Sequence, residues 1–179
     1  MQSKIGKSTL EIVVGDITKQ DVDAIVNAAN NRLTPGGGVS GAIHRAAGPK
    51  LWKECKTLGG CKTGEAKITK GYNLPASYVI HTVGPRYSGS PNDAVKLASC
   101  YRSSIQLASR YKLKSIAFPA ISTGIYGYPM EEAAKVALST IVEELKKLDS
   151  QMLVRLVLFD KNAAEIHERI FQEILKELE

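Results

Sequence analysis

The sequence has few of the residues that mark disulfide-bonded, metal-binding or nucleic-acid-binding proteins. It holds three cysteines, an odd number without a CxxC spacing, and only 6% of its residues are aromatic. The three cysteines and three histidines show no metal-ligand spacing, so we expect neither a metal nor another cofactor. No run of basic residues exceeds Lys146-Lys147, which is a weak footprint for nucleic acid.

Long apolar segments are also missing. No stretch approaches the roughly 20 apolar residues that a membrane-spanning helix needs, and Met1–Thr9 lacks the apolar centre of a signal peptide. We therefore expect no membrane partner. The unpaired cysteines favour a reducing compartment, and we expect a cytoplasmic protein.

The overall composition is that of one globular domain. The chain has 179 residues, of which 44% are hydrophobic and 23% charged, and we expect residues 1–179 to form a single domain. The formal net charge is +6, with a sequence pI near 9.2. This surplus suggests an anionic partner and leaves nucleotides, nucleic acids and acidic membrane surfaces open.

Short β-like runs alternate with amphipathic helical segments along the chain. The patterns predict strands at 9–14, 22–26, 66–70, 78–83, 115–118 and 153–159, and helices at 39–56, 92–111, from Pro129 onward, and after Asp160. In the last helix, apolar residues recur every fourth position at Ile166, Ile170, Ile174 and Leu178. This alternation predicts a three-layer α/β domain with a mainly parallel sheet.

Ligands of such domains bind beyond the carboxyl ends of the strands. Four polar or glycine-rich segments follow predicted strands: 15–17, 27–38, 119–129 and 159–160. We expect these segments to line one cleft.

Two glycine-bearing loops precede helices. Gly36–Gly41 fits the pattern G-x-G-x-x-G, which places a pyrophosphate against backbone amides at a helix N-terminus, but it does not follow a strand directly as in dinucleotide-binding domains. Ser122–Gly127 is the second loop, and alone it could be an ordinary strand-to-helix connection. Together the loops could grip a diphosphate, with amides and the Ser and Thr hydroxyls donating hydrogen bonds.

Other polar residues at the strand ends each have a structural and a functional interpretation. Asp16 could cap the turn that follows it, or accept a hydrogen bond from the exocyclic amine of a base such as adenine. Asn27 and Asn30 could form turns, or orient sugar hydroxyls or a water. Phe159 could belong to the core, or stack on a base.

Several ordered motifs together resemble the macro domain family, and within it the MacroD type. They are Gly15–Thr18, Asn27–Asn30, Gly36–Val39, Ala42–Gly48, Thr63–Ala66, Tyr78–Pro85, Ser122–Gly127 and Phe159-Asp160. The resemblance covers nearly the whole chain. It implies an α/β/α sandwich with a central mixed, mainly parallel sheet.

The resemblance also implies an ADP-ribose site and, in many MacroD-type members, hydrolysis of ADP-ribose esters on acidic side chains and of O-acetyl-ADP-ribose. Asp16 would bind the adenine amine with the backbone of Ile17 beside it, and Phe159 would stack on the ring. The two loops would wrap the diphosphate, and Asn30 would face the distal ribose. The implied ligand-binding residues are Asp16, Ile17, Asn27, Asn30, Gly36, Gly37, Gly38, Val39, Ser40, Ser122, Thr123, Gly124, Ile125, Tyr126 and Phe159, with Asn30, Ser40 and Tyr126 as the catalytic candidates.

One position departs from the family pattern. Ten residues after Asn30, where hydrolytic MacroD sequences have aspartate, this chain has Ser40. A serine hydroxyl is a poor general base near neutral pH, and loss of such a base costs roughly 10²- to 10⁴-fold in rate. A water held between Asn30 and the substrate's own diphosphate could still attack the distal ribose.

Four interpretations stay open from the sequence. They are an ADP-ribosyl hydrolase acting on modified proteins or O-acetyl-ADP-ribose, a non-catalytic ADP-ribose reader, a nicotinamide dehydrogenase, and a protein that binds poly(ADP-ribose) ends or nucleic acid without sequence specificity. The dehydrogenase needs a substrate domain for which 179 residues leave little room. The lack of Lys and Arg in both loops favours recognition of phosphate by backbone amides.

Overall fold

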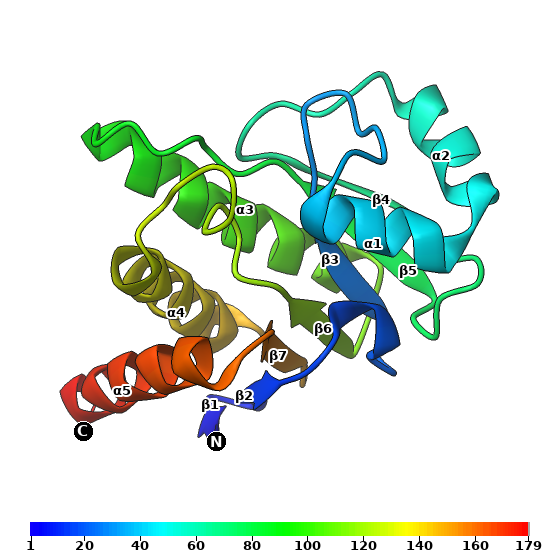
Figure 1. Cartoon of the computed structure of the whole chain (residues 1–179). Helices are drawn as coiled ribbons and strands as arrows, with labels where there is room; N and C mark the ends of the chain where they lie inside the picture. The colour runs from blue at the N-terminus through cyan, green and yellow to red at the C-terminus, as the bar shows by residue number, and fades with distance from the viewer. Residues whose placement is uncertain (179) are drawn as a thin grey trace.

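A computed structural model, which describes residues 1–178, places a seven-stranded sheet between two layers of helices (Figure 1). The strands are β1 (Gln2–Ile5), β2 (Ser8–Val14), β3 (Ala24–Ala28), β4 (Ala66–Lys70), β5 (Tyr78–Thr82), β6 (Ser115–Phe118) and β7 (Leu153–Leu158). The helices are α1 (Gly38–Ala47), α2 (Pro49–Cys55), α3 (Pro91–Arg110), α4 (Met130–Lys147) and α5 (Lys161–Glu177). Short 3₁₀ turns cover Ile17–Lys19 and Lys56–Leu58.

The sheet is mixed and mainly parallel, as predicted. Its strand order is β1-β2-β7-β6-β3-β5-β4, in which the five central strands are parallel and the two edge strands antiparallel to their neighbours. The carboxyl ends of β2, β7, β6, β3 and β5 therefore lie along one edge. All four segments expected to line a cleft follow these strands.

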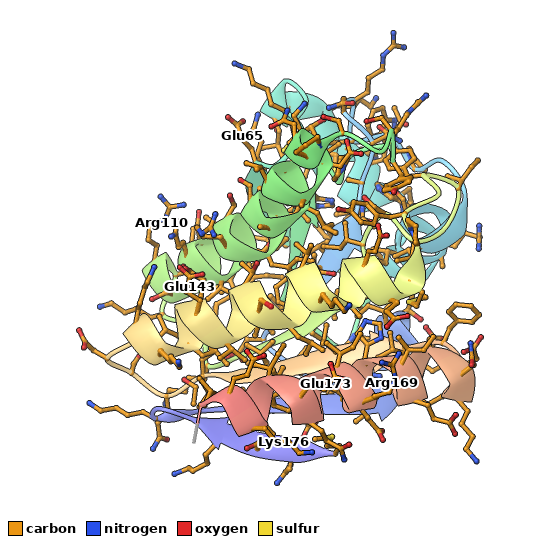
Figure 2. All side chains as sticks on the ribbon, turned by 90° about the vertical axis from the view of Figure 1, so that its left-hand side faces the viewer. Glu65, Arg110, Glu143, Arg169, Glu173 and Lys176 are labelled. Carbon is orange, nitrogen blue, oxygen red and sulfur yellow. The ribbon has the colours of Figure 1, made fainter. Side chains whose placement is uncertain are left out.

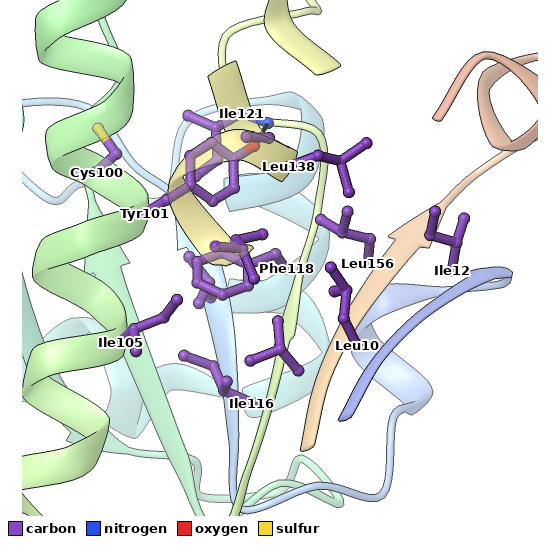
Figure 3. Close-up of a cluster of buried hydrophobic side chains, with 14 of the residues drawn as sticks. Leu10, Ile12, Cys100, Tyr101, Ile105, Ile116, Phe118, Ile121, Leu138 and Leu156 are labelled. Atoms are coloured by element: carbon purple, nitrogen blue, oxygen red, sulfur yellow. Dashed lines mark hydrogen bonds between the residues drawn. The ribbon is translucent and has the colours of Figure 1, made fainter. Parts of the chain in front are cut away.

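Each face of the sheet carries its own hydrophobic core, which confirms the three-layer arrangement. Helices α3, α4 and α5 lie side by side over one face, toward the viewer in Figure 2, and α1 and α2 cover the other. Strand β3 alternates as expected for a strand buried on both sides, because Ala24 and Val26 face the first layer and Ile25 faces the second. Figure 3 shows the first core, where the rings of Tyr101 and Phe118 are 5.1 Å apart.

The structure corrects three details of the sequence prediction. The helix expected at 39–56 is two helices, since Gly48 has a φ of 89° and Pro49 starts α2. Strand β1 was not anticipated, because Ile5 is its only buried residue. The stripe on α5 ends before Leu178, which follows the helix and is 43% exposed.

Among residues 1–178, none of the helices has both the length and the apolarity to cross a membrane.

Candidate functional site

A cavity of about 340 Å³ opens at the carboxyl edge of the sheet, beyond β6, β3 and β5. Both glycine-bearing loops form its walls, as the sequence predicted. The lining residues are Ala28, Ala29, Asn30, Gly36, Gly37, Gly38, Val39, Ser40, Gly84, Ala120, Ile121, Ser122, Gly124, Ile125 and Tyr126.

The first loop presents the N-terminus of α1 to this cavity. Gly36 and Gly38 have φ values of 59° and 55°, which strongly favour glycine, and Gly37 caps α1 without a side-chain hydrogen bond. The amides of Gly38, Val39 and Ser40 consequently have no protein acceptor within residues 1–178. Free amides at the positive end of a helix dipole suit a phosphate.

The second loop is held open by its own hydroxyl groups. Ser122, with a φ of 68°, donates from Oγ to the Pro85 carbonyl at 2.8 Å, and Thr123 donates from Oγ1 to the Ala120 carbonyl at 3.0 Å. In this structure both hydroxyls donate to backbone carbonyls, so their hydrogen bonds to a ligand stay a prediction. Ser122 still lines the cavity, but Thr123 does not, and both serve to shape the loop.

Asn30 lines the cavity, but its side chain is already committed to the first loop. Its Oδ1 accepts from the amides of Arg32 and Thr34, both at 3.1 Å. Its Nδ2 donates to the Thr34 carbonyl and to Thr34 Oγ1, at 3.2 and 2.8 Å. In this arrangement Asn30 sets the path of the loop and has no polar atom left over for a ribose or a water.

Asn27 is fully buried and lies beneath the cavity, so the structure does not support its assignment as a ligand contact. Its Nδ2 donates to Ser40 Oγ at 3.3 Å and to His81 Nδ1 at 3.2 Å. His81 in turn donates from Nε2 to Thr69 Oγ1 at 2.9 Å. Ser40 Oγ donates to the Thr34 carbonyl at 3.3 Å. We call these five residues the buried polar chain, which reaches the cavity at Ser40.

His81, the histidine of the buried polar chain, is neutral near pH 7. Burial, with a smaller contribution from the neighbouring His44, lowers the pKa of His81 to about 3. Burial also lowers the pKa of His44, whose ring centre lies 6.4 Å from that of His81. Neutral His81 can accept at Nδ1 and donate at Nε2, as the buried polar chain requires.

The residues expected at an adenine end lie on the two strands next to the cavity. Asp16 follows β2 and Phe159 follows β7, and the register pairs Val14 with Leu158 immediately before them. Neither residue lines the cavity, nor does Ile17, which is buried. Asp16, Phe159 and the cavity therefore lie along one continuous row of strand ends, from β2 to β5, and this arrangement suits an extended ligand.

Asp16 and Phe159 keep surfaces free for a ligand. Asp16 caps its turn, as one of its interpretations held, because its Oδ1 accepts from the amide and hydroxyl of Thr18 at 2.9 and 2.7 Å. These hydrogen bonds lower the pKa of Asp16, and its second carboxylate oxygen has no partner within the described residues. Phe159 is 79% exposed, so it does not belong to the core.

Two residues near the cavity received no role from the sequence. Gly84 lines the cavity next to the second loop, and a Cβ there would come within 2.2 Å of Ser122 Oγ. Arg86 lies 5.4 Å from the ring centre of Tyr126, which lines the cavity. For Gly84 the sequence held a signal, because the motif 78–85 continues past the end of a buried strand to the edge where ligands bind; Arg86 lies just outside that motif.

The polar groups of this site suit an anionic nucleotide better than a metal. Within residues 1–178 no three His, Cys, Asp or Glu side chains are placed to hold a metal ion. The cavity walls supply backbone amides from two loops, and its neighbouring strand ends supply a carboxylate and an aromatic ring. The fold and site thus define an α/β domain with a cavity at the carboxyl edge of its sheet, and the backbone amides at its wall suit a phosphate.

The sequence and the fold are both similar to those of known proteins of one family. The Macro domain model matches residues 26–137. A macro domain-containing protein of Methanosarcina mazei is 57% identical over 167 residues, covering 93% of this chain and 89% of that protein. A solved variant of the Oceanobacillus iheyensis macrodomain with ADPR superposes with a TM-score of 0.95, at 46% identity and 98% coverage of each chain.

The chain belongs to the macro domain family. It is also 64% identical over 135 residues to the ADP-ribose glycohydrolase MACROD2 of Xenopus laevis, which places it near the MacroD type. That match covers 74% of this chain and 32% of the Xenopus protein. The chain therefore spans about a third of that relative's length.

Proposed function

We propose that this protein binds ADP-ribose along the row of strand ends and hydrolyses ADP-ribosyl esters of aspartate and glutamate side chains. The observation that carries the proposal is the pair of loops around the cavity, with the free amides of Gly38, Val39 and Ser40 at one wall. A diphosphate between the loops would accept hydrogen bonds from fixed dipoles. Adenine would then lie between Asp16 and Phe159.

The proposed reaction breaks the bond between C1 of the distal ribose and the ester oxygen. A water attacks C1, the side-chain carboxylate leaves with the bonding electrons, and the water's proton passes to a phosphate oxygen of the substrate or to solvent. Asn30 contributes by fixing the loop around the distal ribose, because its polar atoms are used within the loop. Tyr126 lines the cavity, with Arg86 beside its ring.

Two relatives support the proposal that this protein binds ADP-ribose and hydrolyses its esters. The Oceanobacillus iheyensis domain was solved with ADPR, and the Xenopus laevis relative is named an ADP-ribose glycohydrolase. O-acetyl-ADP-ribose has an ester on the same ribose, and we propose it as a second substrate. The ends of poly(ADP-ribose) present the same nucleotide and are proposed as ligands.

Ser40 favours one alternative, a reader that binds ADP-ribose without turnover. The described part of the cavity lining contains no carboxylate to deprotonate a water, since its polar side chains are Asn30, Ser40, Ser122 and Tyr126. Such a reader would retain the nucleotide and leave the ester intact. The two functions share the binding step and differ only in chemistry.

Two measurements separate these functions. Calorimetric titration with ADP-ribose tests binding, and a product assay on an ADP-ribosyl-glutamate peptide tests turnover. Binding with release of ADP-ribose supports the hydrolase, and binding without release supports the reader. Failure to bind ADP-ribose would overturn both.

The reduced cysteines support a proposed cytoplasmic location. Cys55, Cys61 and Cys100 are all free and buried, and burial raises the pKa of the Cys55 and Cys100 thiols to about 11. Such thiols are weakly reactive and need no oxidising compartment. Fractionation of the native host, with the protein recovered outside the cytoplasmic fraction, would contradict this.

A further inference from the structure

The positive charge of the chain is concentrated around α1 and α2. Residues 32–70 contain eight Lys and Arg against two Glu, whereas the rest of the chain holds sixteen residues of each sign. The basic residues are Arg32, Arg45, Lys50, Lys53, Lys56, Lys62, Lys67 and Lys70. This segment therefore accounts for the whole formal surplus of +6.

These cations are exposed and lack carboxylate partners. All but Lys67 are exposed, and none forms an ion pair within the described residues. The ion pairs of the protein lie on other elements, such as Arg169 with Glu173 on α5 (Figure 2). Of the two acids in the segment, Glu54 accepts hydrogen bonds from the Tyr72 hydroxyl and the Lys70 amide.

A second hollow, of about 430 Å³, lies between α1 and α2 and adjoins the ADP-ribose cavity. Gly36 lines both, so the first loop is a thin wall between them. The hollow is lined by Pro35, Gly36, Gly41, His44, Arg45, Gly48, Pro49 and Trp52. Most of these lining residues are apolar or glycine, and Arg45 is the one cation among them.

The outer face of α2 extends this hollow with further cations. Pro49, Trp52, Lys53 and Lys56 are spaced three and four residues apart, which places them on one side of the helix and the turn that continues it. Lys56 Nζ lies 5.8 Å from the centre of the Trp52 ring. We call Arg45, Trp52, Lys53 and Lys56 the α1–α2 basic face.

We propose that the α1–α2 basic face binds an acidic segment of the ADP-ribosylated polypeptide, next to the modified side chain. The inference rests on the proposed function and adds to it the class of protein substrate. With the ADP-ribosyl group in the cavity, the polypeptide would cross Gly36 and enter the hollow. Arg45 can bind a carboxylate with two parallel hydrogen bonds, and Trp52 offers an apolar contact.

An acidic polypeptide fits this face better than a nucleic acid or a polymer of ADP-ribose. Proteins that bind single strands without sequence preference combine a basic groove with several aromatic side chains on which bases stack. Among the described residues that line the hollow, Trp52 is the only Phe, Tyr or Trp, and the other ring is that of His44, which is buried. Its neighbour Lys56 leaves that ring partly covered by a cation.

The test compares two ADP-ribosyl-glutamate peptides, one with aspartate and glutamate flanks and one with glycine and serine flanks. We expect the triple variant Arg45→Gln, Lys53→Gln, Lys56→Gln to lose about tenfold in kcat/KM on the acidic peptide, within the roughly 3- to 160-fold that three exposed ion pairs allow. On the neutral peptide, and in affinity for free ADP-ribose, the variant should match the parent protein.

A control triple variant changes the net charge equally at a distance from this face. Lys96→Gln, Lys135→Gln and Lys176→Gln remove exposed cations from α3, α4 and α5. General electrostatic attraction would lower the rate equally in both triple variants, and this outcome would overturn the proposal. Tighter binding of an oligonucleotide than of an unmodified acidic peptide of equal charge would overturn it as well.

Equilibrium binding keeps this inference separable from the proposed function. If the protein binds ADP-ribose but does not cleave the ester, affinity for the two intact peptides replaces kcat/KM. If the parent protein prefers the acidic peptide and only the Arg45→Gln, Lys53→Gln, Lys56→Gln variant loses this preference, the acidic segment docks on the α1–α2 basic face of a protein that binds without turnover. Equal affinity for both peptides would refute docking while leaving ADP-ribose binding in place.

Discussion

Replacing Ser40 with aspartate would place a carboxylate at the point where the buried polar chain reaches the cavity. Ser40 is the third residue of α1, and its Oγ lies 3.3 Å from both Asn27 Nδ2 and the Thr34 carbonyl oxygen. The neighbouring free amides of α1 favour a negative charge at this position. Asn27 can donate to a carboxylate as it now donates to the hydroxyl.

The expected gain in turnover is about 100-fold on an ADP-ribosyl-glutamate peptide. A positioned general base contributes roughly 10²- to 10⁴-fold. The lower end is expected here, because the α1 amides and Asn27 stabilise the ionised form and so make it a weaker base. A 100-fold gain corresponds to about 2.7 kcal/mol of activation free energy.

Single-turnover release of ADP-ribose from the peptide measures this change, and calorimetry with ADP-ribose verifies that the cavity is intact. Ser40→Asn is the matched control, since it has the shape of aspartate without its basicity, and it should not accelerate release. Unchanged or slower release by Ser40→Asp with undiminished affinity would refute the general-base argument. Equal acceleration by both variants would attribute the effect to shape.

Three further predictions follow from the site and its supports. Gly84→Ala should weaken ADP-ribose binding by about tenfold or more in calorimetry, because its Cβ would lie 2.2 Å from Ser122 Oγ and displace the second loop; unchanged affinity would contradict the role of that loop. Phe159→Ala should lower the affinity for ADP-ribose about tenfold, as loss of base stacking does. The Tm should stay unchanged, because the ring is 79% exposed. A lower Tm with full affinity would instead make Phe159 a core residue. The free energy of unfolding in urea should fall by at least about 2 kcal/mol from pH 7.5 to pH 5. His81 accounts for about 2 kcal/mol of this fall, because its folded pKa is about 3 against 6.5 unfolded, so the unfolded chain binds the extra proton and stability is lost as the pH drops below 6.5. The lowered pKa values of the buried His44 and His167 add to the loss, and a flat profile would contradict all three shifts.

The sequence predicted the location of the site well because that location depends on local patterns. Short β-branched runs identify the strands, and parallel strands must end at one edge, so the segments after β2, β3, β6 and β7 had to lie along that edge. Of these, the segments after β3 and β6 line the cavity, whereas 15–17 and 159–160 lie beside it and do not line it. Asp160 accepts from the Ala163 amide at 2.8 Å, as its position before α5 predicted. Features that depend on one segment of chain were therefore predictable.

The uses of individual polar side chains were not predictable, since they depend on partners elsewhere in the fold. Ser122 donates to a carbonyl 37 residues away, and Asn27 reaches His81 across 54 residues. Both residues were assigned to the ligand because their types and positions suited it. Asn30 differs, because its partners are only two and four residues ahead, which agrees with the interpretation that Asn30 forms a turn.

The direction of the hydrogen bonds explains why position 40 can differ without disturbing its surroundings. Asn27 Nδ2 donates to both His81 and position 40, so the buried polar chain needs only an acceptor there. Serine and aspartate both provide one. Serine also donates a hydrogen bond to the Thr34 carbonyl. A carboxylate cannot donate this bond, so the carbonyl would accept from solvent or ligand instead. The supports of the cavity are therefore compatible with either residue, and we expect the choice at position 40 to affect the rate of the chemical step more than the binding of ADP-ribose.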